Sequence, residues 1–192
     1  MKRTKISKVP DHYDYRNKPL KTNIPESMYT VLTNDPSMTA WGWAVVTLKG
    51  VVIKTGAIKT EFLAKKKKVK VSEDRIRRIK EITKALLLVI KEYKIDRIVS
   101  EVPHGSQNAS AAVMIGVVTG ILQTFGDCLN IPVEWYYEGD CKKAISGKRS
   151  LSNKDEMVKL IDNRFTVPWM KWKWENQAIA DALAVFNLAI KN

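Results

Sequence analysis

The chain has 192 residues, enough for one domain with a substantial core and short for two. Its 45% hydrophobic fraction excludes wholesale disorder, no apolar run reaches the roughly 18 residues of a membrane span, and no secretory signal follows its basic start. Thirty-three Lys and Arg against twenty Asp and Glu give a net charge of +13. That charge favours a polyanionic partner, most simply nucleic acid. We expect a cytoplasmic protein, nucleoid-associated or virus-encoded, that binds no membrane.

The sequence predicts two segments of unequal character. Residues 1–28 are basic and carry no apolar stretch, so we expect a flexible N-terminal arm, and residues 29–192 form the single folded domain. Cys128 falls in a predicted helix and Cys141 in a predicted loop, without metal-ligand spacing, so both are interpreted as ordinary reduced thiols.

Three apolar runs open the domain, at residues 29–32, 41–48 and 51–58. They are separated by "TNDPSM" and "KG", turn chemistry that predicts an antiparallel meander. An amphipathic helix follows, for which Ser72 is a candidate N-cap.

The remaining elements alternate between strand and helix. The strand "IDRIVSEV" precedes a helix over residues 108–129, "PVEWYY" is a further strand, a helix opens near Ser152 or Asn153, and "ENQAIADALAVFNLAI" is a closing helix. The order β-β-β-α-β-α-β-α-α predicts an α/β fold, a mixed five-stranded sheet with its first three strands antiparallel and helices packed on it.

Three carboxylates share an unusual placement. Asp35 ends the first strand, Glu101 ends the fourth, and Asp181 interrupts the apolar closing helix. If the first and fourth strands are parallel neighbours, these acids crowd at one sheet edge and require a cation, for which Mg²⁺ or Mn²⁺ is suited. Two such ions can hydrolyse a phosphodiester. The alternative is three unrelated acids, with Asp35 a simple turn former.

Several blocks together resemble the RuvC-like Holliday junction resolvases of the RNase H-like fold. "NDPSMTAWGWAVV" with "GAIKT" is similar to the opening hairpin, and "SEVPHGSQNASAAVMIGVVTG" to the second acidic strand and its helix. "IPVEWYYEGDCKKAISGKRSLSNKDEMV" resembles the segment with DNA-binding lysines, and "ADALAVF" the closing catalytic helix. The resemblance covers roughly residues 30–190.

The resemblance implies an Mg²⁺-dependent homodimer that cuts four-way DNA junctions, with Mn²⁺ as a substitute ion. Its implied metal ligands are Asp35, Glu101 and Asp181. Its implied DNA-binding residues, including a histidine at the family's aromatic position, are Lys142, Lys143, Lys154, His104, Asn108 and Arg149.

One position departs from the family pattern. The family has an Asp or His one helical turn before the helical Asp, where this chain has Ala178. Gln177 is the catalytic candidate nearest to that position, and Glu175 precedes both. The fourth ligand could come from Glu175 or Gln177, the site could bind metal weakly, or Gln177 could be an inactivating replacement of Glu.

The leading hypothesis is therefore a crossover junction endodeoxyribonuclease of DNA recombination and repair. Two alternatives stay open at this point: a debranching nuclease with broader substrates, and a junction-binding protein with a weakened catalytic site. The sequence does not determine the cleavage preference.

Overall fold

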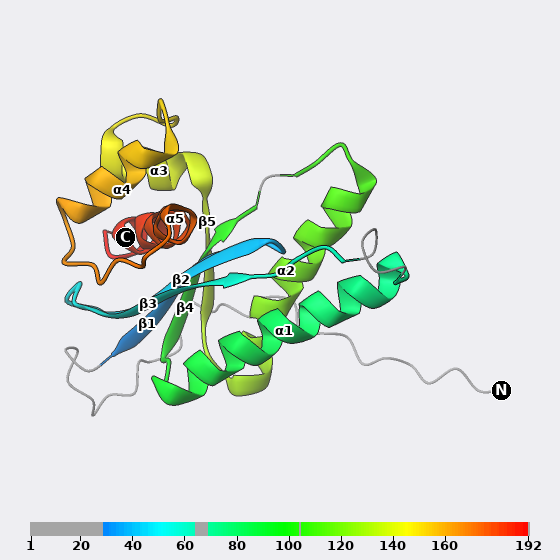
Figure 1. The fold of residues 1–192 in the computed structure, drawn as a ribbon. Helices are drawn as coiled ribbons and strands as arrows, with labels where there is room; N and C mark the ends of the chain where they lie inside the picture. The colour runs from blue at the N-terminus through cyan, green and yellow to red at the C-terminus, as the bar shows by residue number, and fades with distance from the viewer. Residues whose placement is uncertain (1–28, 64–68, 104, 192) are drawn as a thin grey trace, which may run out of the picture.

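The computed structural model describes residues 29–63, 69–103 and 105–191, which form a mixed five-stranded sheet flanked by helices (Figure 1). The predicted arm of residues 1–28 lies outside the described residues. The elements in chain order are β1 (Thr30–Asp35), β2 (Ala40–Thr47), β3 (Val52–Lys59), α1 (Val71–Glu92), β4 (Arg97–Val102), α2 (Ala109–Leu129), β5 (Val133–Tyr137), α3 (Glu138–Ser146), α4 (Lys154–Asp162) and α5 (Lys173–Ala189).

The strands lie in the order β3-β2-β1-β4-β5. β1, β2 and β3 form an antiparallel meander, whereas β4 runs parallel to β1 and β5 runs parallel to β4. The parallel pairs follow from the helical crossovers α1 and α2, since a parallel connection needs a long return path. The predicted fold class is confirmed, including the antiparallel first three strands.

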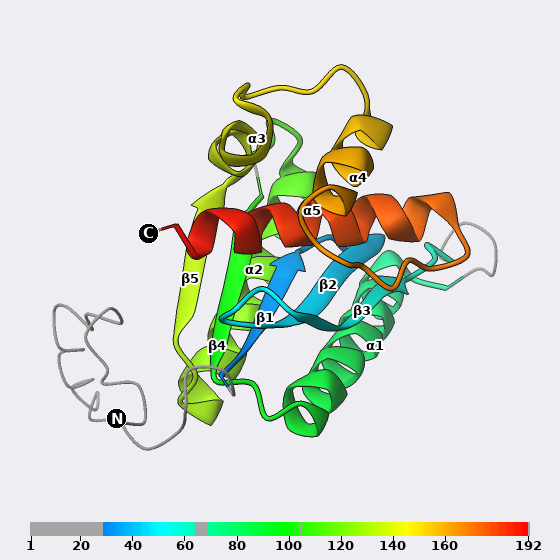
Figure 2. The same ribbon diagram turned by 90° about the vertical axis from the view of Figure 1, so that its left-hand side faces the viewer.

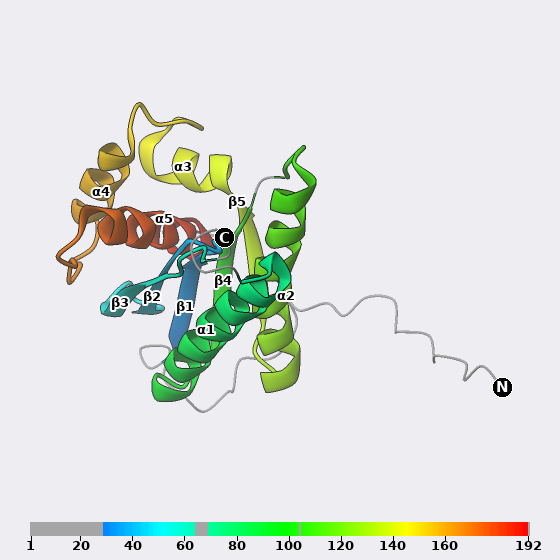
Figure 3. The same ribbon diagram turned by 45° about the vertical axis from the view of Figure 1, so that its right-hand side comes forward.

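Helices cover both faces of the sheet (Figures 1 and 3). Val31 and Val99 pack with α3, α4 and α5 on one face, whereas Leu32 and Ile98 pack with α1 and α2 on the other. Neighbouring residues of one strand point to opposite faces, so both central strands are apolar on both sides. This alternation also decides the face on which a strand-end carboxylate lies.

α5 lies directly against β2 and crosses β1 and β4 (Figure 2). A Cβ atom on Gly42 would stand 2.0 Å from the carbonyl oxygen of Ala178, so only glycine permits this approach. The hydroxyl group of Thr33 in β1 donates a hydrogen bond to the carbonyl oxygen of Ala182. Both contacts fix the height of α5 above the sheet next to Asp181.

The structure corrects two sequence-based expectations about helices. α1 begins at Val71 with Lys70 as N-cap, so Ser72 lies inside the helix. The segment after β5, expected to be a loop, is the nine-residue α3, and Cys141 is buried within it. α3 was missed because it buries only Cys141 and Ile145, too few apolar residues for a clear helical period.

α2 contradicts the expectation that no run is apolar enough to span a membrane. Of the described helices it alone has that length and composition, with a mean hydropathy of 1.6 over 18 residues and 17% of them buried. Its buried positions, Val118, Leu122, Phe125 and Gly126, face the core. Val113 on its outer side is exposed, which leaves an apolar helix face for a partner.

Candidate active site

Asp35 and Glu101 lie side by side at the carboxyl edge of the sheet. The parallel pairing of β1 and β4 sets Asn34 opposite Ser100, and the next residues are Asp35 and Glu101. Adjacent strands are separated by about 4.7–4.9 Å. Because Val99 faces α5, Glu101 two residues later faces it too, and Asp35 follows the corresponding alternation in β1.

Four carboxylates and one ammonium meet at this edge. The pKa of Glu101 is raised to about 9, first by burial and then by the charges of Asp35, Glu138 and Asp181, while Lys142 lowers it. Asp181 reaches the edge from α5, and Glu138 reaches it from the first residue of α3. The charges of two strand-end acids and one helical acid therefore act at one edge of the sheet, and their assignment as site residues stays a prediction.

Cys141 lies beside this cluster but takes no part in its chemistry. Burial raises the pKa of its thiol to about 12, and the charge of Glu101 adds to the effect. A thiol of such high pKa stays protonated at neutral pH in the metal-free protein, where it is a poor nucleophile.

The donors at this edge fit a hard divalent cation. Carboxylate oxygens are the preferred ligands of Mg²⁺ and Mn²⁺, and the Lys142 ammonium already stands in as a positive charge among them. In the described part of the chain no three Asp, Glu, His or Cys side chains, as they stand, are grouped so as to hold a metal ion.

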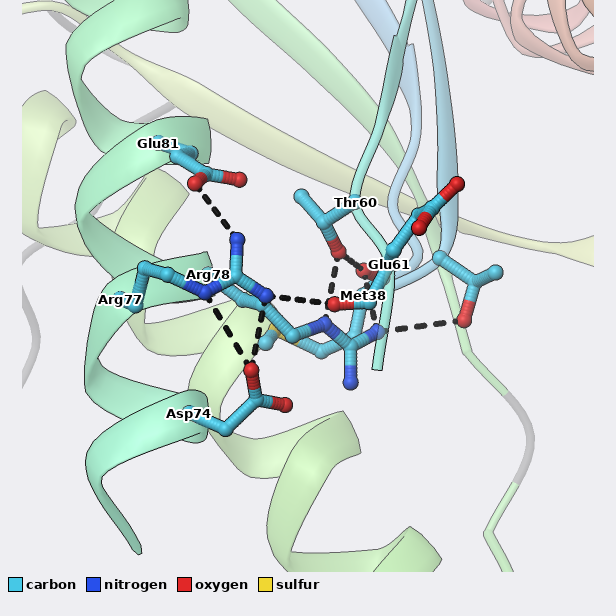
Figure 4. Close-up of polar contacts among 8 residues, drawn as sticks. Met38, Thr60, Glu61, Asp74, Arg77, Arg78 and Glu81 are labelled. Carbon is cyan, nitrogen blue, oxygen red and sulfur yellow. Dashed lines mark hydrogen bonds and ion pairs between the residues drawn. The ribbon is translucent and has the colours of Figure 1, made fainter. Parts of the chain in front are cut away.

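A buried arginine holds the segment that follows Asp35 (Figure 4). Arg78 of α1 donates from Nε to Thr60 Oγ1 at 2.7 Å and from Nη2 to the carbonyl oxygen of Met38 at 2.7 Å. Thr60 also donates its hydroxyl to that carbonyl and its N–H to the carbonyl oxygen of Thr39. This network fixes the turn that returns the chain from the strand-end carboxylate to β2.

The two adjacent candidate lysines of α3 have different surroundings. Lys142 forms an ion pair with Glu138 and lies in the acidic cluster. Lys143 is exposed and lines an open surface pocket of about 500 Å³ together with Tyr137 and Asp140. Of the two, Lys142 is therefore the one placed next to the strand-end carboxylates.

The other predicted DNA-binding residues are scattered or undescribed. Arg149 is exposed and pairs through Nη2 with Asp140 Oδ1 at 2.9 Å. The side chain of Asn108 caps α2 by accepting a hydrogen bond from the N–H of Ala111 at 3.1 Å. His104 and the side chain of Lys154 lie outside what the structure describes, although the Lys154 backbone begins α4.

The closing helix offers no acid at the position that departs from the family pattern. Ala178 is buried, and the Gln177 amide donates to Asp155 Oδ1 of α4 at 3.0 Å. Glu175 Oε2 accepts a hydrogen bond from the N–H of Trp172 at 3.2 Å, as part of a capping box. Gln177 and Glu175 both have partners within the helical layer.

Glu138 is an acid at this edge that the sequence analysis does not single out. It follows the strand "PVEWYY" directly, as Asp35 and Glu101 end their strands, and that signal was available in the sequence. The signal was not used because "EGD" was interpreted as part of a loop. Only the placement of β5 beside β4 shows that Glu138 belongs to the same edge.

Comparisons with known proteins agree with this architecture. Residues 31–189 match the family model described as crossover junction endodeoxyribonuclease RuvC. The crossover junction endodeoxyribonuclease RuvC of Pseudothermotoga lettingae is 31% identical over 117 residues, which cover 60% of this chain and 70% of the relative.

Solved structures show the same fold at lower sequence identity. Thermus thermophilus RuvC in complex with a Holliday junction substrate has a TM-score of 0.64 and 19% identity, covering 84% of this chain and 96% of that chain. The yeast mitochondrial Holliday junction resolvase has a TM-score of 0.56 and 11% identity, covering 88% and 81% of the two chains.

Proposed function

The chain belongs to the RuvC family of crossover junction endodeoxyribonucleases, and from this premise we propose that Asp35, Glu101 and Asp181 are the metal ligands with which it resolves Holliday junctions. The activity of the family is metal-dependent hydrolysis of phosphodiesters in four-way DNA junctions, in recombination and repair. We propose Mg²⁺ as the resident ion, with Mn²⁺ able to replace it. The expected location is the cytoplasm.

The observation that carries the ligand assignment is the crowding of acids from separate elements at one sheet edge. Asp35 and Glu101 end adjacent parallel strands, and the charge of Asp181 on α5 acts on Glu101 together with that of Asp35. Like charges held this close, with little water to screen them, cost stability in the metal-free protein, and a divalent cation removes that cost. Such perturbed groups gather at sites that hold charge for chemistry.

The chain's own residues have separable roles in the proposed reaction. Asp35 and Glu101, on adjacent parallel strands, would hold the cation together with Asp181 from α5. When bound, a divalent cation supplies an activated water and offsets the charge that develops on the scissile phosphate. Lys142 orients that phosphate as a point charge.

The homodimer follows from the family and from the outer face of α2. A junction has two equivalent strands to cut, and a two-fold dimer presents two equivalent sites. The exposed apolar side of α2, with Val113, Gly116 and Gly120, is the surface that we assign to the second copy. A Cβ atom added to either glycine would meet no atom within 4 Å, so the helix leaves room for close approach.

The proposed function is tested by cleavage and binding measured on the same variant. Asp35→Asn should lower nicking of a four-way junction in Mg²⁺ by about 100-fold or more, because the amide is a poor ligand. Junction binding should persist or improve, since one negative charge facing DNA is lost. Wild-type nicking by this variant would overturn the assignment. Forks, flaps and duplex tested in parallel separate a resolvase from a broader debranching nuclease.

A further inference from the structure

Glu138 occupies a third strand end on the edge that already holds Asp35 and Glu101. β5 pairs with β4 in parallel, with Tyr136 opposite Glu101, and Glu138 follows two residues after Tyr136. Tyr136 packs in the same core layer as α5, on the face to which Glu101 points. The backbone register therefore brings Glu138 to the same edge and the same face as the proposed ligands.

Glu138 is partly buried and ion-paired within the acidic cluster. Its charge acts on Glu101 together with those of Asp35 and Asp181. The side chain of Glu138 is only 30% exposed, and its partner Lys142 is only 24% exposed. Glu138 therefore belongs to the same group of charges as the proposed ligands, on the edge where the strand register places it.

Lys142 lies between Glu138 and the other acids. Its ammonium forms an ion pair with Glu138 one helical turn earlier, and the charges of Asp181 and Glu101 also act on it. One side-chain cation is thus paired with Glu138 and lies within reach of the charges of two further carboxylates, on α5 and β4. The acids at this edge therefore already have a positive charge beside them.

The described residues at the start of α5 could supply the fourth metal ligand, which the family has at the position of Ala178, only by breaking existing hydrogen bonds. Glu175 is held in the capping box by Trp172, and Gln177 is held by Asp155. Ala178 has no ligand atom. Glu138 already lies at the edge, and its ion pair with Lys142 is partly exposed, so exchanging that ammonium for a divalent ion costs little net stability.

We propose that Glu138 is the fourth acidic ligand of the metal centre, supplied from the end of β5 in place of the residue that the closing helix lacks at Ala178. Lys142 neutralises the acids in the metal-free protein, leaves Glu138 when the ion binds, and is then free to contact a phosphate. This inference rests on the proposed function, because it concerns the same metal centre.

The test is Mn²⁺ binding to the full-length protein without DNA, followed by electron paramagnetic resonance and calorimetry. Glu138→Gln should weaken Mn²⁺ affinity by about tenfold or more. Lys142→Ala should tighten it, because the competing ammonium is gone. The matched control is Asp140→Asn, which removes an acid from the same turn of α3 and should leave the affinity unchanged.

Opposite results are decisive. Wild-type Mn²⁺ affinity in folded Glu138→Gln, judged by its thermal melt, overturns the inference, and so does weaker binding by Lys142→Ala. Measuring Mn²⁺ binding by Asp35→Asn in the same assay distinguishes failure of the proposed function from failure of this inference. If Asp35→Asn also binds Mn²⁺ normally, the proposed function fails, whereas if it binds weakly and Glu138→Gln binds normally, only this inference fails.

Discussion

Glu101 is the proposed metal ligand on which the charges of the other acids act. Its neighbours across the sheet and on two helices are acids, and its burial prevents water from screening them. In the unfolded chain the same carboxyl group ionises near pH 4.5. Folding without metal therefore costs free energy at any pH at which the Glu101 carboxyl group is ionised in the unfolded chain.

The pH dependence of stability follows from that shift. Because the pKa of Glu101 is higher in the folded state, its contribution to stability is complete below about pH 4.5 and is lost as the pH rises towards about 9. In chelator, Glu101→Gln should melt above the wild type at pH 9 by roughly 2–4 °C for each kcal/mol of repulsion removed. The difference between the two proteins should shrink towards pH 5.

Thermal melts in chelator across this range check the prediction, with saturating Mg²⁺ as the matched condition. Added Mg²⁺ should stabilise the wild type more than Glu101→Gln. A difference in melting temperature between the two proteins that is the same at every pH would show that Glu101 is not destabilised by burial and by the neighbouring charges.

At the residue scale, sequence could locate the strand-end acids but not their partners. Asp35 and Glu101 follow apolar runs, so their place at the sheet edge was predictable once the strands were assigned. The bond from Gln177 to Asp155 depends on how α4 packs against α5, which no local pattern encodes. The role of Glu138 likewise depends on the order of strands.

At the scale of elements, the site depends on the height of α5 above the sheet. Gly42 is paired with Asp35 across β1 and β2, and it is the residue over which the backbone of Ala178 passes. The same contact that packs the helix thus sets the distance from Asp181 to the strand-end acids. A side chain at Gly42 would have to displace helix backbone, which cannot rotate away.

Gly42→Ala should therefore damage both packing and catalysis. Overpacking at this point should lower the free energy of unfolding by about 1–3 kcal/mol. A shift of α5 by about 1 Å should reduce nicking by about 100-fold. Urea unfolding and junction nicking measure the two effects, and Gly139→Ala, whose new Cβ would meet only Arg149 side-chain atoms at 3.8 Å or more, is the control.

If Gly42→Ala keeps wild-type stability and nicking, α5 can shift on the sheet without loss, and the Gly42 contact does not fix its position.

The secondary-structure elements were otherwise predicted well, because the meander, the crossover helices and the Asn153 cap all have local signals. α3 and the start of α1 lacked them, since α3 buries few apolar residues and α1 buries Asp74 and Arg78 on its core side.

At the scale of the molecule, the apolar outer face of α2 and the net charge of +13 describe two different partners. The charge suits a DNA backbone, whereas the α2 face suits a second copy of the chain. Composition predicted the first partner directly. The second partner was expected from the family resemblance, but its surface was not, because an apolar helix has the same pattern whether its outer side meets a partner or the core.

Val113→Asp should separate the protomers. A carboxylate in the middle of an apolar interface loses its water without gaining a partner, so the dimer should dissociate. Light scattering after size-exclusion chromatography measures the mass, and paired cleavage of both junction strands should become independent nicking. Leu88→Asp is the matched control, since Leu88 of α1 is 59% exposed and Val113 is 53% exposed. A dimer that survives Val113→Asp would move the interface to another surface.

Acids from β1, β4 and α5, joined by one from the end of β5, are proposed to form a divalent-metal centre for junction cleavage. The most direct measurement is a crystal structure with Mn²⁺, in which anomalous scattering locates the ions. We predict a peak within about 2.0–2.6 Å of oxygens of Asp35 and Glu101, with Asp181 and Glu138 completing the shell and Lys142 withdrawn. Anomalous peaks found only away from Asp35 and Glu101 would contradict the account.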